Sequence, residues 1–156
     1  MQNKKYRLVP FEQDHFFRMP LRPEDEADLD GLDMLGLFPS WQGGFTALYD
    51  DKPVCIFGGN YDEGVVTMWA VTGLLTDRPP LAVTKEARAL ITAFFNRGAH
   101  RIQVYCHKDN KKSFDWLQRA LGFSLEGFMR KSGPNKQDRF LFSLVDDDFR
   151  RLSWAH

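Results

Sequence analysis

The apolar side chains of this chain follow two different spacings along the sequence. Between residues 84 and 97 they recur every three or four positions, at Ala87, Leu90, Ile91, Phe94 and Phe95. A spacing near 3.6 residues places such side chains on one face of a helix. Thr84 is a favoured N-cap residue and Gly98 a favoured residue just past a helix end, so a helix is predicted over 84–97.

Shorter apolar runs bounded by turn residues predict strands. The run at 65–71 is almost continuously apolar, which is typical of a strand with both faces buried near the centre of a sheet. The run at 100–106 alternates between apolar and polar side chains, as a half-buried strand does. Turn residues at 50–53 and 60–64 separate the middle strands. The predicted strands are 6–9, 45–49, 54–57, 65–71, 100–106, 123–129 and 139–145.

Two further helices are predicted from capping and charge. An acidic segment follows Arg22, with Pro23 in the first turn, where proline is tolerated, and with carboxylates that complement the helix dipole. We expect this helix to run to Leu35 and to end at Gly36. The other helix is expected over 110–121, and its apolar stripe consists of Phe114, Leu117 and Leu121.

The order of these elements predicts one α/β domain over residues 1–156. No repeat and no linker rich in Gly, Ser or Pro divides the chain. The strands at 65–71 and 100–106 flank the 84–97 helix, and a strand–helix–strand unit forms parallel neighbours in a sheet. The strands on either side of that unit are joined by turns and are expected to be antiparallel. We therefore predict a mixed sheet of about six to seven strands flanked by helices.

Composition excludes several classes of protein. The 156 residues include 21 Lys or Arg and 21 Asp or Glu, so no overall basic excess indicates a nucleic-acid or membrane partner. Cys55 and Cys106 lack metal-ligand spacing, and we predict neither a disulfide framework nor a metal site. The sequence has no signal peptide and no apolar run of bilayer length. We expect a soluble, cytoplasmic protein.

The neutral total conceals an uneven distribution of charge. Residues 1–63 carry 6 basic and 12 acidic side chains, whereas residues 64–156 carry 15 basic and 9 acidic side chains. The basic half suits an anionic, phosphorylated ligand, and the acidic half suits a cationic one. Neutrality therefore does not exclude charged ligands that contact only one half of the chain.

The second half of the chain contains a characteristic run of residues around the predicted 110–121 helix. Asn110 opens the helix, Ser113 follows three residues later, Gly122 and Phe123 close it, and Glu126-Gly127 lies in the next strand. This run resembles the C-terminal signature of the GNAT superfamily of N-acetyltransferases. The resemblance implies a GNAT-like sheet that splays between the strands at 65–71 and 100–106.

Segments of the first half extend this resemblance to residues 20–145. The segment at 21–29, Phe57-Gly58, the segment at 68–72 and Trp116-Leu117 resemble the acetyltransferase-like internal virion proteins of podophages. A phage or prophage origin would make the protein virion-associated rather than purely cytoplasmic. The resemblance also allows a homodimer through the last strands or the tail from Phe149 to Trp154.

The superfamily resemblance implies acetyl-CoA as the co-substrate. In that superfamily the first of the two splayed strands pairs with the pantetheine arm, and the following helix binds the pyrophosphate at its N-terminus, where free N–H groups and the helix dipole favour anions. The matching positions in this chain predict the cofactor-binding residues Val71, Thr72, Arg78, Lys85, Arg88 and Asn110.

The implied reaction is direct acetyl transfer to an unidentified amine. Such a transfer needs a base for the ammonium proton and an acid for the departing thiolate. Leu117 stands where the superfamily commonly has a tyrosine acid, so Tyr105 at the strand end is the nearest substitute. Glu63, at the entry to the central strand, is the predicted base. Asn110 is equally well explained as a helix cap, and Glu63 as a solvated turn residue.

An alternative function follows from two departures from the superfamily pattern. The segment 72–84 lacks the glycine-rich pyrophosphate loop, and Pro79 and Pro80 supply no N–H donors. Leu117 supplies no proton. The alternative is a catalytically degenerate GNAT-fold phage protein with a role in virion morphogenesis or protein interaction.

Overall fold

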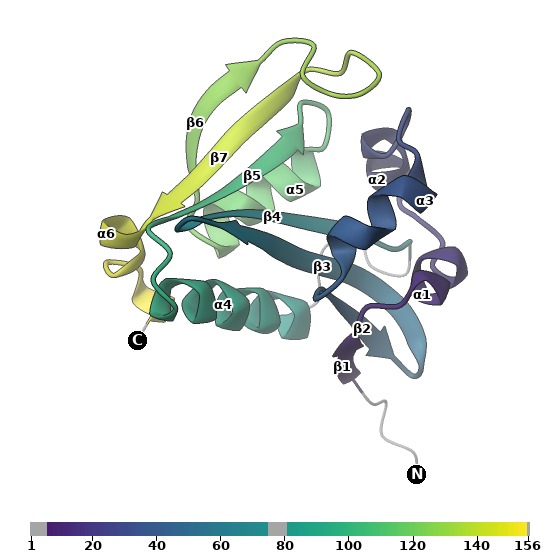
Figure 1. Cartoon of the computed structure of the whole chain (residues 1–156), viewed down its shortest axis with the longest axis horizontal. Coiled ribbons are helices and arrows are strands. Elements are labelled where there is room, and N and C mark those ends of the chain that lie inside the picture. Colours follow the sequence, from purple (N-terminus) through teal and green to yellow (C-terminus); the bar gives the residue numbers. More distant parts are fainter. Residues whose placement is uncertain (1–5, 75–80, 156) are drawn as a thin grey trace.

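Seven strands form one mixed sheet in the computed structural model, which describes residues 6–74 and 81–155 (Figure 1). The strand order across the sheet is β1-β2-β3-β4-β5-β7-β6. All neighbours are antiparallel except β4 and β5. The predicted fold class is confirmed. The strands are β1 Tyr6–Pro10, β2 Phe45–Tyr49, β3 Lys52–Asp62, β4 Val65–Thr72, β5 Arg101–His107, β6 Ser124–Met129 and β7 Arg139–Val145.

Helices cover both faces of this sheet. The helices α1, α2 and α3 lie together in Figure 1, apart from α4, and α4 connects β4 to β5. The α-helices are α1 Gln13–Arg18, α2 Pro23–Asp28, α3 Met34–Leu37, α4 Leu81–Asn96, α5 Lys111–Asp115 and α6 Asp146–Phe149. Further short helical segments are Phe38–Trp41 and Ser153–Ala155, both 3-10, and Trp116–Ala120, a π-helix. None of the described helices is long and apolar enough to cross a membrane.

Three buried clusters show which elements pack on which face. The largest joins α4 and the π-helix to β4, β5 and β7, through side chains such as Ile91, Leu117 and Ile102. A second cluster packs the N-terminal helices onto β3 and β4, and Val71 belongs to it. The third packs α4 onto β2 and β3. Successive β4 side chains point to opposite faces, so Met68 joins the first cluster whereas Trp69 packs against the second.

The two central strands separate after a short pairing. In the described part of the sheet, β4 and β5 pair over three positions, from Val65 with Arg101 to Thr67 with Gln103. β4 nevertheless continues to Thr72 and β5 to His107. Beyond Thr67 and Gln103, β4 stays paired with β3 and β5 with β7, while the described part of the sheet has no pairing between β4 and β5. The splay implied by the superfamily resemblance is therefore present.

The acidic segment after Arg22 is not the single helix that the sequence predicted. α2 ends at Asp28 and α3 begins at Met34, so the prediction of one helix to Leu35 is wrong. Gly31 lies between them with φ +84°, and a Cβ there would approach Asn135 Cβ to 3.1 Å. A left-handed residue in close contact with another loop interrupts the helix. Gly36, the predicted stop, lies inside α3.

The boundaries of the two later helices also differ from their predictions. α4 begins at Leu81, so Thr84 is buried in the helix and is not its N-cap. Thr84 Oγ1 instead accepts a hydrogen bond of 3.0 Å from Trp116 Nε1. Asn110 is the N-cap of α5, as its residue type indicates, and its Oδ1 accepts from Ser113 N at 3.1 Å. The turn predicted at 60–64 is shorter, because β3 runs to Asp62.

Candidate functional site

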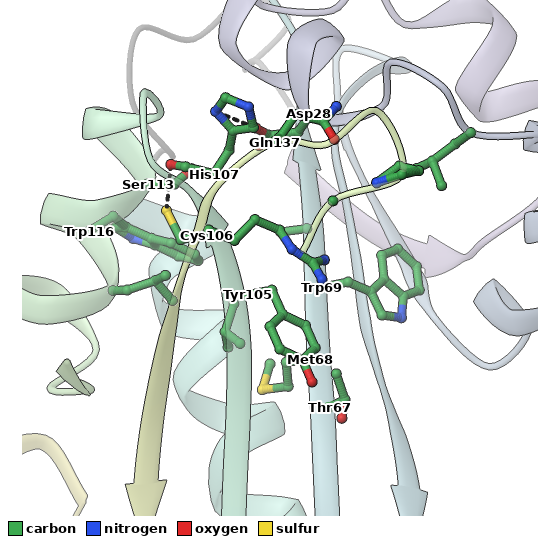
Figure 2. A pocket seen from close by; sticks show the side chains of 17 residues that line it. Asp28, Thr67, Met68, Trp69, Tyr105, Cys106, His107, Ser113, Trp116 and Gln137 are labelled. Carbon is green, nitrogen blue, oxygen red and sulfur yellow. Dashed lines mark hydrogen bonds and ion pairs between the residues drawn. The ribbon is translucent and has the colours of Figure 1, made fainter. Parts of the chain in front are cut away.

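A cavity of about 260 Å³ lies where β4 and β5 diverge. It passes between the strands, so residues from both faces of the sheet line it. Ser113 and Trp116 contribute from the α5 side, and Asp28 and Tyr105 from the α2 side. Figure 2 draws the lining side chains, among them Met68 and Thr67 of β4 and Tyr105 of β5. The cavity therefore has one end lined by residues of the α5 side and another end lined by residues of the α2 side.

The backbone edge of β4 faces this gap at alternate residues. Thr72 N donates a hydrogen bond of 3.1 Å to Asp25 Oδ1, and Thr72 O accepts one of 3.3 Å from Arg22 N. Thr72 therefore presents its peptide groups away from β3. Backbone groups alternate along a strand, and Ala70 therefore faces the same edge as Thr72. The side chain of Ala70 is exposed and lines the cavity. Ala70 is the position where β4 presents backbone groups to a molecule in the gap.

A buried ion pair fixes α2 against the end of β4. Arg22 Nε donates a hydrogen bond of 2.6 Å to Asp25 Oδ2, and both side chains are at most 4% exposed. Burial raises the pKa of Asp25 above its usual value, while Arg22 and the Thr72 N–H oppose that rise. Asp25 therefore closes the β4 edge at Thr72 with a side chain of the same molecule.

Asp28 is the acidic side chain of the cavity wall. Its Oδ2 accepts a hydrogen bond of 2.8 Å from Asn110 Nδ2, and its Oδ1 lies 3.9 Å from His107 Nδ1. Within the described structure, Oδ1 is buried without a hydrogen-bond partner. Burial raises the pKa of Asp28 to about 6, the charge of Asp25 adds to this, and Asn110, His107 and Arg22 oppose it. A carboxyl with such a pKa exchanges a proton near neutral pH.

Tyr105 contributes the phenol of the cavity. Its side chain is 40% exposed, and the guanidinium of Arg139 lies 4.5 Å from its ring centroid. Arg139 is in turn held by Ser132, whose Oγ and carbonyl oxygen accept bonds of 3.0 and 2.6 Å. A cation over the ring face stabilises the stacked position of both groups. Tyr105 is therefore oriented by β7 and by the loop that precedes it.

The cysteine in the cavity is not an activated nucleophile. Cys106 is buried, and its Sγ donates to the carbonyl oxygens of His107 and Asn110, each at 3.6 Å. Burial raises the pKa of this thiol to about 12, and nearby Asp28 and Asp25 add to the effect. The thiolate is the nucleophilic form, so Cys106 is inert at neutral pH.

The structure brings only some of the predicted site residues to the cavity. Tyr105 lines it. Glu63 is exposed in the tight turn between β3 and β4 with φ 48°, at the opposite end of β4 from the splay, and is not among the residues that line the cavity. Val71 is buried under the N-terminal helices, with its backbone in the pairing to β3. The base assigned to Glu63 stays a prediction without geometric support.

The remaining predicted cofactor contacts are mostly engaged within the protein. Thr72 N bonds Asp25, and the Asn110 side chain bonds both Ser113 and Asp28. Arg88 donates to Ala120 O at 2.8 and 3.2 Å and lies 5.4 Å from the Trp154 ring centroid. Lys85 is exposed on α4. Arg78 lies outside the described residues.

Asp28 lines the cavity but was not among the site residues predicted from the sequence. In the sequence it is one of several carboxylates in a helical segment, which usually indicates a solvated face. Its partner Asn110 is 82 residues away, and no local spacing predicts that contact. One sequence feature could have pointed to this place. Asn110 is a predicted helix cap at the end of the splayed strand, and a cavity at the splay lies close to that cap.

Comparisons with known proteins identify the fold. No protein-family model and no curated protein matches the sequence. A GCN5-related N-acetyltransferase from Brucella melitensis is similar in structure, with TM-score 0.66 and 20% identity over 96% of this chain and 79% of the other. The ribosomal-protein-S18-alanine N-acetyltransferase from Escherichia coli has TM-score 0.66 and 16% identity over 90% of this chain and 94% of the other.

A third similar structure was solved with a bound ligand. It is a ribosomal L7/L12 alpha-N-protein acetyltransferase in complex with coenzyme A, with TM-score 0.58 and 17% identity over 74% of this chain and 68% of the other. At these identities the similarity concerns the fold and not the substrate. The chain has the fold of GNAT N-acetyltransferases, with the cavity at its central splay.

Proposed function

We propose that this protein transfers an acetyl group from acetyl-CoA directly to an amine. The observation that carries the proposal is the cavity between β4 and β5, which opens through the sheet where the strands cease to pair. A donor entering from the α5 side and an acceptor entering from the α2 side would meet there. Proximity of two bound reactants accounts for a large part of the barrier reduction in such transfers.

Several residues of the chain fit the acyl end of the donor. The backbone of Ala70 faces the gap, and Trp116 and Leu117 form an apolar wall against which an alkyl arm would pack. Of the basic residues predicted to contact the phosphates, Lys85 of α4 is exposed, and Arg78, which lies outside the described residues, stays a sequence-based candidate. When bound, acetyl-CoA supplies a thioester carbonyl that is open to attack by an amine.

Direct transfer is favoured over a covalent acyl-enzyme. Cys106 is the thiol that lines the cavity, and its pKa of about 12 keeps it protonated. An unactivated thiol is a poor nucleophile, so an acyl-cysteine route has no support in the described cavity. Tyr105 is the proposed acid, because its phenol lies in the cavity and a departing thiolate needs a proton.

A second function is favoured by one observation. The Thr72 N–H and the Asn110 side chain, which the superfamily resemblance assigns to the donor, are both bonded to α2. A GNAT-fold protein that no longer binds the donor would be free to fill those positions in this way. The second candidate is thus a catalytically degenerate domain with a role in protein interaction, including virion morphogenesis if the protein is phage-encoded.

Calorimetric titration with acetyl-CoA and with CoA separates these two functions. The enzyme should bind with micromolar affinity, and Ala70→Phe should abolish binding by filling the cavity from an exposed position. Ala89→Phe is the matched control, because Ala89 is exposed on α4 and does not line the cavity. Absence of heat for the unmodified protein at millimolar ligand would exclude the enzyme and favour the degenerate domain.

A further inference from the structure

We propose that Asp28 binds the acceptor as a primary ammonium and takes up one of its protons through the carboxylate oxygen Oδ1. This assignment rests on the proposed acetyl transfer and deepens it, since it names the acceptor group that the cavity recognises and the residue that prepares it for attack. Asp28 lines the cavity at its α2 end, whereas the previously predicted base, Glu63, does not line it.

The two oxygens of Asp28 have different surroundings. Oδ2 is held by Asn110 Nδ2 at 2.8 Å, and this bond fixes the plane of the carboxylate. Oδ1 is buried and, among the described residues, has no hydrogen-bond partner. An unsatisfied buried acceptor is costly, and most such groups in folded proteins have a partner. An N–H donor in the cavity would supply the partner that Oδ1 lacks.

The charge at this end of the cavity selects a cationic donor. Asp28 is accompanied by Asp25 on the same helix, while Arg22 is already paired with Asp25 at 2.6 Å. From β5, His107 Nδ1 lies 3.9 Å from Oδ1, and from α5 the neutral Asn110 faces Oδ2. Arg139 also lines the cavity, but its guanidinium lies over the Tyr105 ring and donates to Ser132. With Arg22 and Arg139 both engaged, Asp28 is the carboxylate that an ammonium in the cavity would meet.

The protonation behaviour of Asp28 agrees with this role. Burial and the neighbouring Asp25 raise its pKa to about 6, against the opposing effects of Asn110, His107 and Arg22. A carboxylate with a raised pKa is a stronger base than an ordinary aspartate and is still ionised at pH 7. Oδ1 is thus available to accept a proton at neutral pH.

The protons of the transfer balance around this residue. Oδ1 takes one proton from the ammonium, which leaves a neutral amine with a free electron pair. The nitrogen forms a bond to the acetyl carbon while the bond between that carbon and the thioester sulfur breaks. Tyr105 gives its phenol proton to the departing sulfur. One of the two remaining N–H protons stays in the amide, and the other leaves the nitrogen and restores the phenol. Asp28 then returns its proton to solvent.

The first test measures Asp28 without any donor or catalysis. Carbon-13 NMR of the aspartate carboxyls should show Asp28 titrating near pH 6, and its signal should move when propylammonium is added at neutral pH. Tetramethylammonium, a cation without N–H groups, should move it less. An Asp28 signal that titrates below the usual aspartate value, or that ignores propylammonium at concentrations of tens of millimolar, would overturn the assignment.

The second test uses variants in the transfer reaction with propylamine as acceptor. Asp28→Asn should lower kcat/KM by about 100-fold or more and remove the inflection near pH 6, because the isosteric amide keeps a carbonyl for Asn110 but accepts no proton. Asp30→Asn is the matched control, since Asp30 Oδ2 bonds Asn135 at 2.6 Å and does not line the cavity. Asp30→Asn should leave kcat/KM unchanged.

Failure of this inference is distinguishable from failure of the proposed function. If acetyl-CoA binds and transfer proceeds equally in Asp28→Asn and in the unmodified protein, the proposed function stands and Asp28 is not the base. If no donor binds to either protein, the proposed function fails, whatever the NMR titration shows. Circular dichroism melting of each variant confirms that a loss of rate is not a loss of folded protein.

Discussion

Asn110 Nδ2 donates a hydrogen bond of 2.8 Å to Asp28 Oδ2 and thereby joins two segments that are 82 residues apart. The other end of the same amide caps α5 through Ser113 N. One buried side chain therefore starts a helix and positions the acidic residue of the cavity. The superfamily resemblance assigned Asn110 to cofactor binding, whereas in this structure its side chain makes hydrogen bonds within the protein.

Replacement of Asn110 should destabilise the fold measurably. Asn110→Ala removes a cap and the partner of a largely buried carboxylate, so we expect a loss of about 2–4 kcal/mol in the free energy of unfolding. Asn135→Ala is the control, because its bond to Asp30 is exposed, and it should cost less than about 0.5 kcal/mol. Urea denaturation followed by fluorescence measures both. Equal losses would show that the buried Asn110 hydrogen bonds stabilise the fold no more than the exposed bond of Asn135 does.

The buried Arg22–Asp25 pair should show strong coupling. Asp25→Ala leaves Arg22 without its partner in a site that is 2% exposed, and we expect a loss of about 3–5 kcal/mol. The double variant Arg22→Met, Asp25→Leu removes both charges and should recover much of that loss. Asp14→Ala breaks the exposed pair with Arg18 and should cost less than about 0.5 kcal/mol. A double variant no more stable than Asp25→Ala would contradict this account.

Asp28 should make stability depend on pH in a direction opposite to that of most carboxylates. Its folded pKa of about 6 is above the ordinary aspartate pKa of 3.8, so the folded state binds a proton between these values and the unfolded state does not. The free energy of unfolding should therefore rise as pH falls from 6.5 to 4.5, relative to Asp28→Asn, whose residue 28 does not titrate. Denaturant unfolding at several pH values tests this. A parallel pH dependence of the two proteins would mean that the Asp28 pKa is ordinary.

Tyr105→Phe tests the proposed acid. Removal of the phenol should lower kcat by about tenfold or more and leave KM for acetyl-CoA nearly unchanged, because the ring and its stacking with Arg139 remain. Glu63→Gln provides the comparison between the two sequence-based candidates. Since Glu63 lies in an exposed turn outside the cavity lining, we expect its turnover to be unchanged. A tenfold loss in Glu63→Gln would restore it as the base.

The regular elements of the fold were predictable because their signals are local. The β2 and β7 strands match their predicted ranges, and β4 occupies the centre of the sheet, as its continuous apolar run indicates. The long helix was predictable from its 3.6-residue spacing, although Thr84 proved to be inside it. Local periodicity identifies an element well and its first residue poorly, because the end of a helix is set by what packs against it.

The errors and omissions arise from contacts between distant segments. The acidic segment has good helix-forming residues, but Gly31 adopts a left-handed conformation where Asn135 approaches it, and the helix breaks there. The partners of Asp28 and Asp25 come from α5 and β4, so neither role can be read from spacing. The splay between β4 and β5 was implied by family resemblance and not by the hydrophobic pattern, which is the same for paired and separated strands.

A proton–nitrogen NMR titration of the labelled protein with acetyl-CoA shows whether the donor binds in the cavity between β4 and β5. We expect amide signals to shift at Ala70 and at residues 104–107, together with the indole signal of Trp116, all of which line or border the cavity. Amides of β1 and β2, at the far side of the sheet, should stay in place. Shifts confined to the surface away from β4 and β5, or no shifts at millimolar acetyl-CoA, would show that acetyl-CoA does not bind in this cavity.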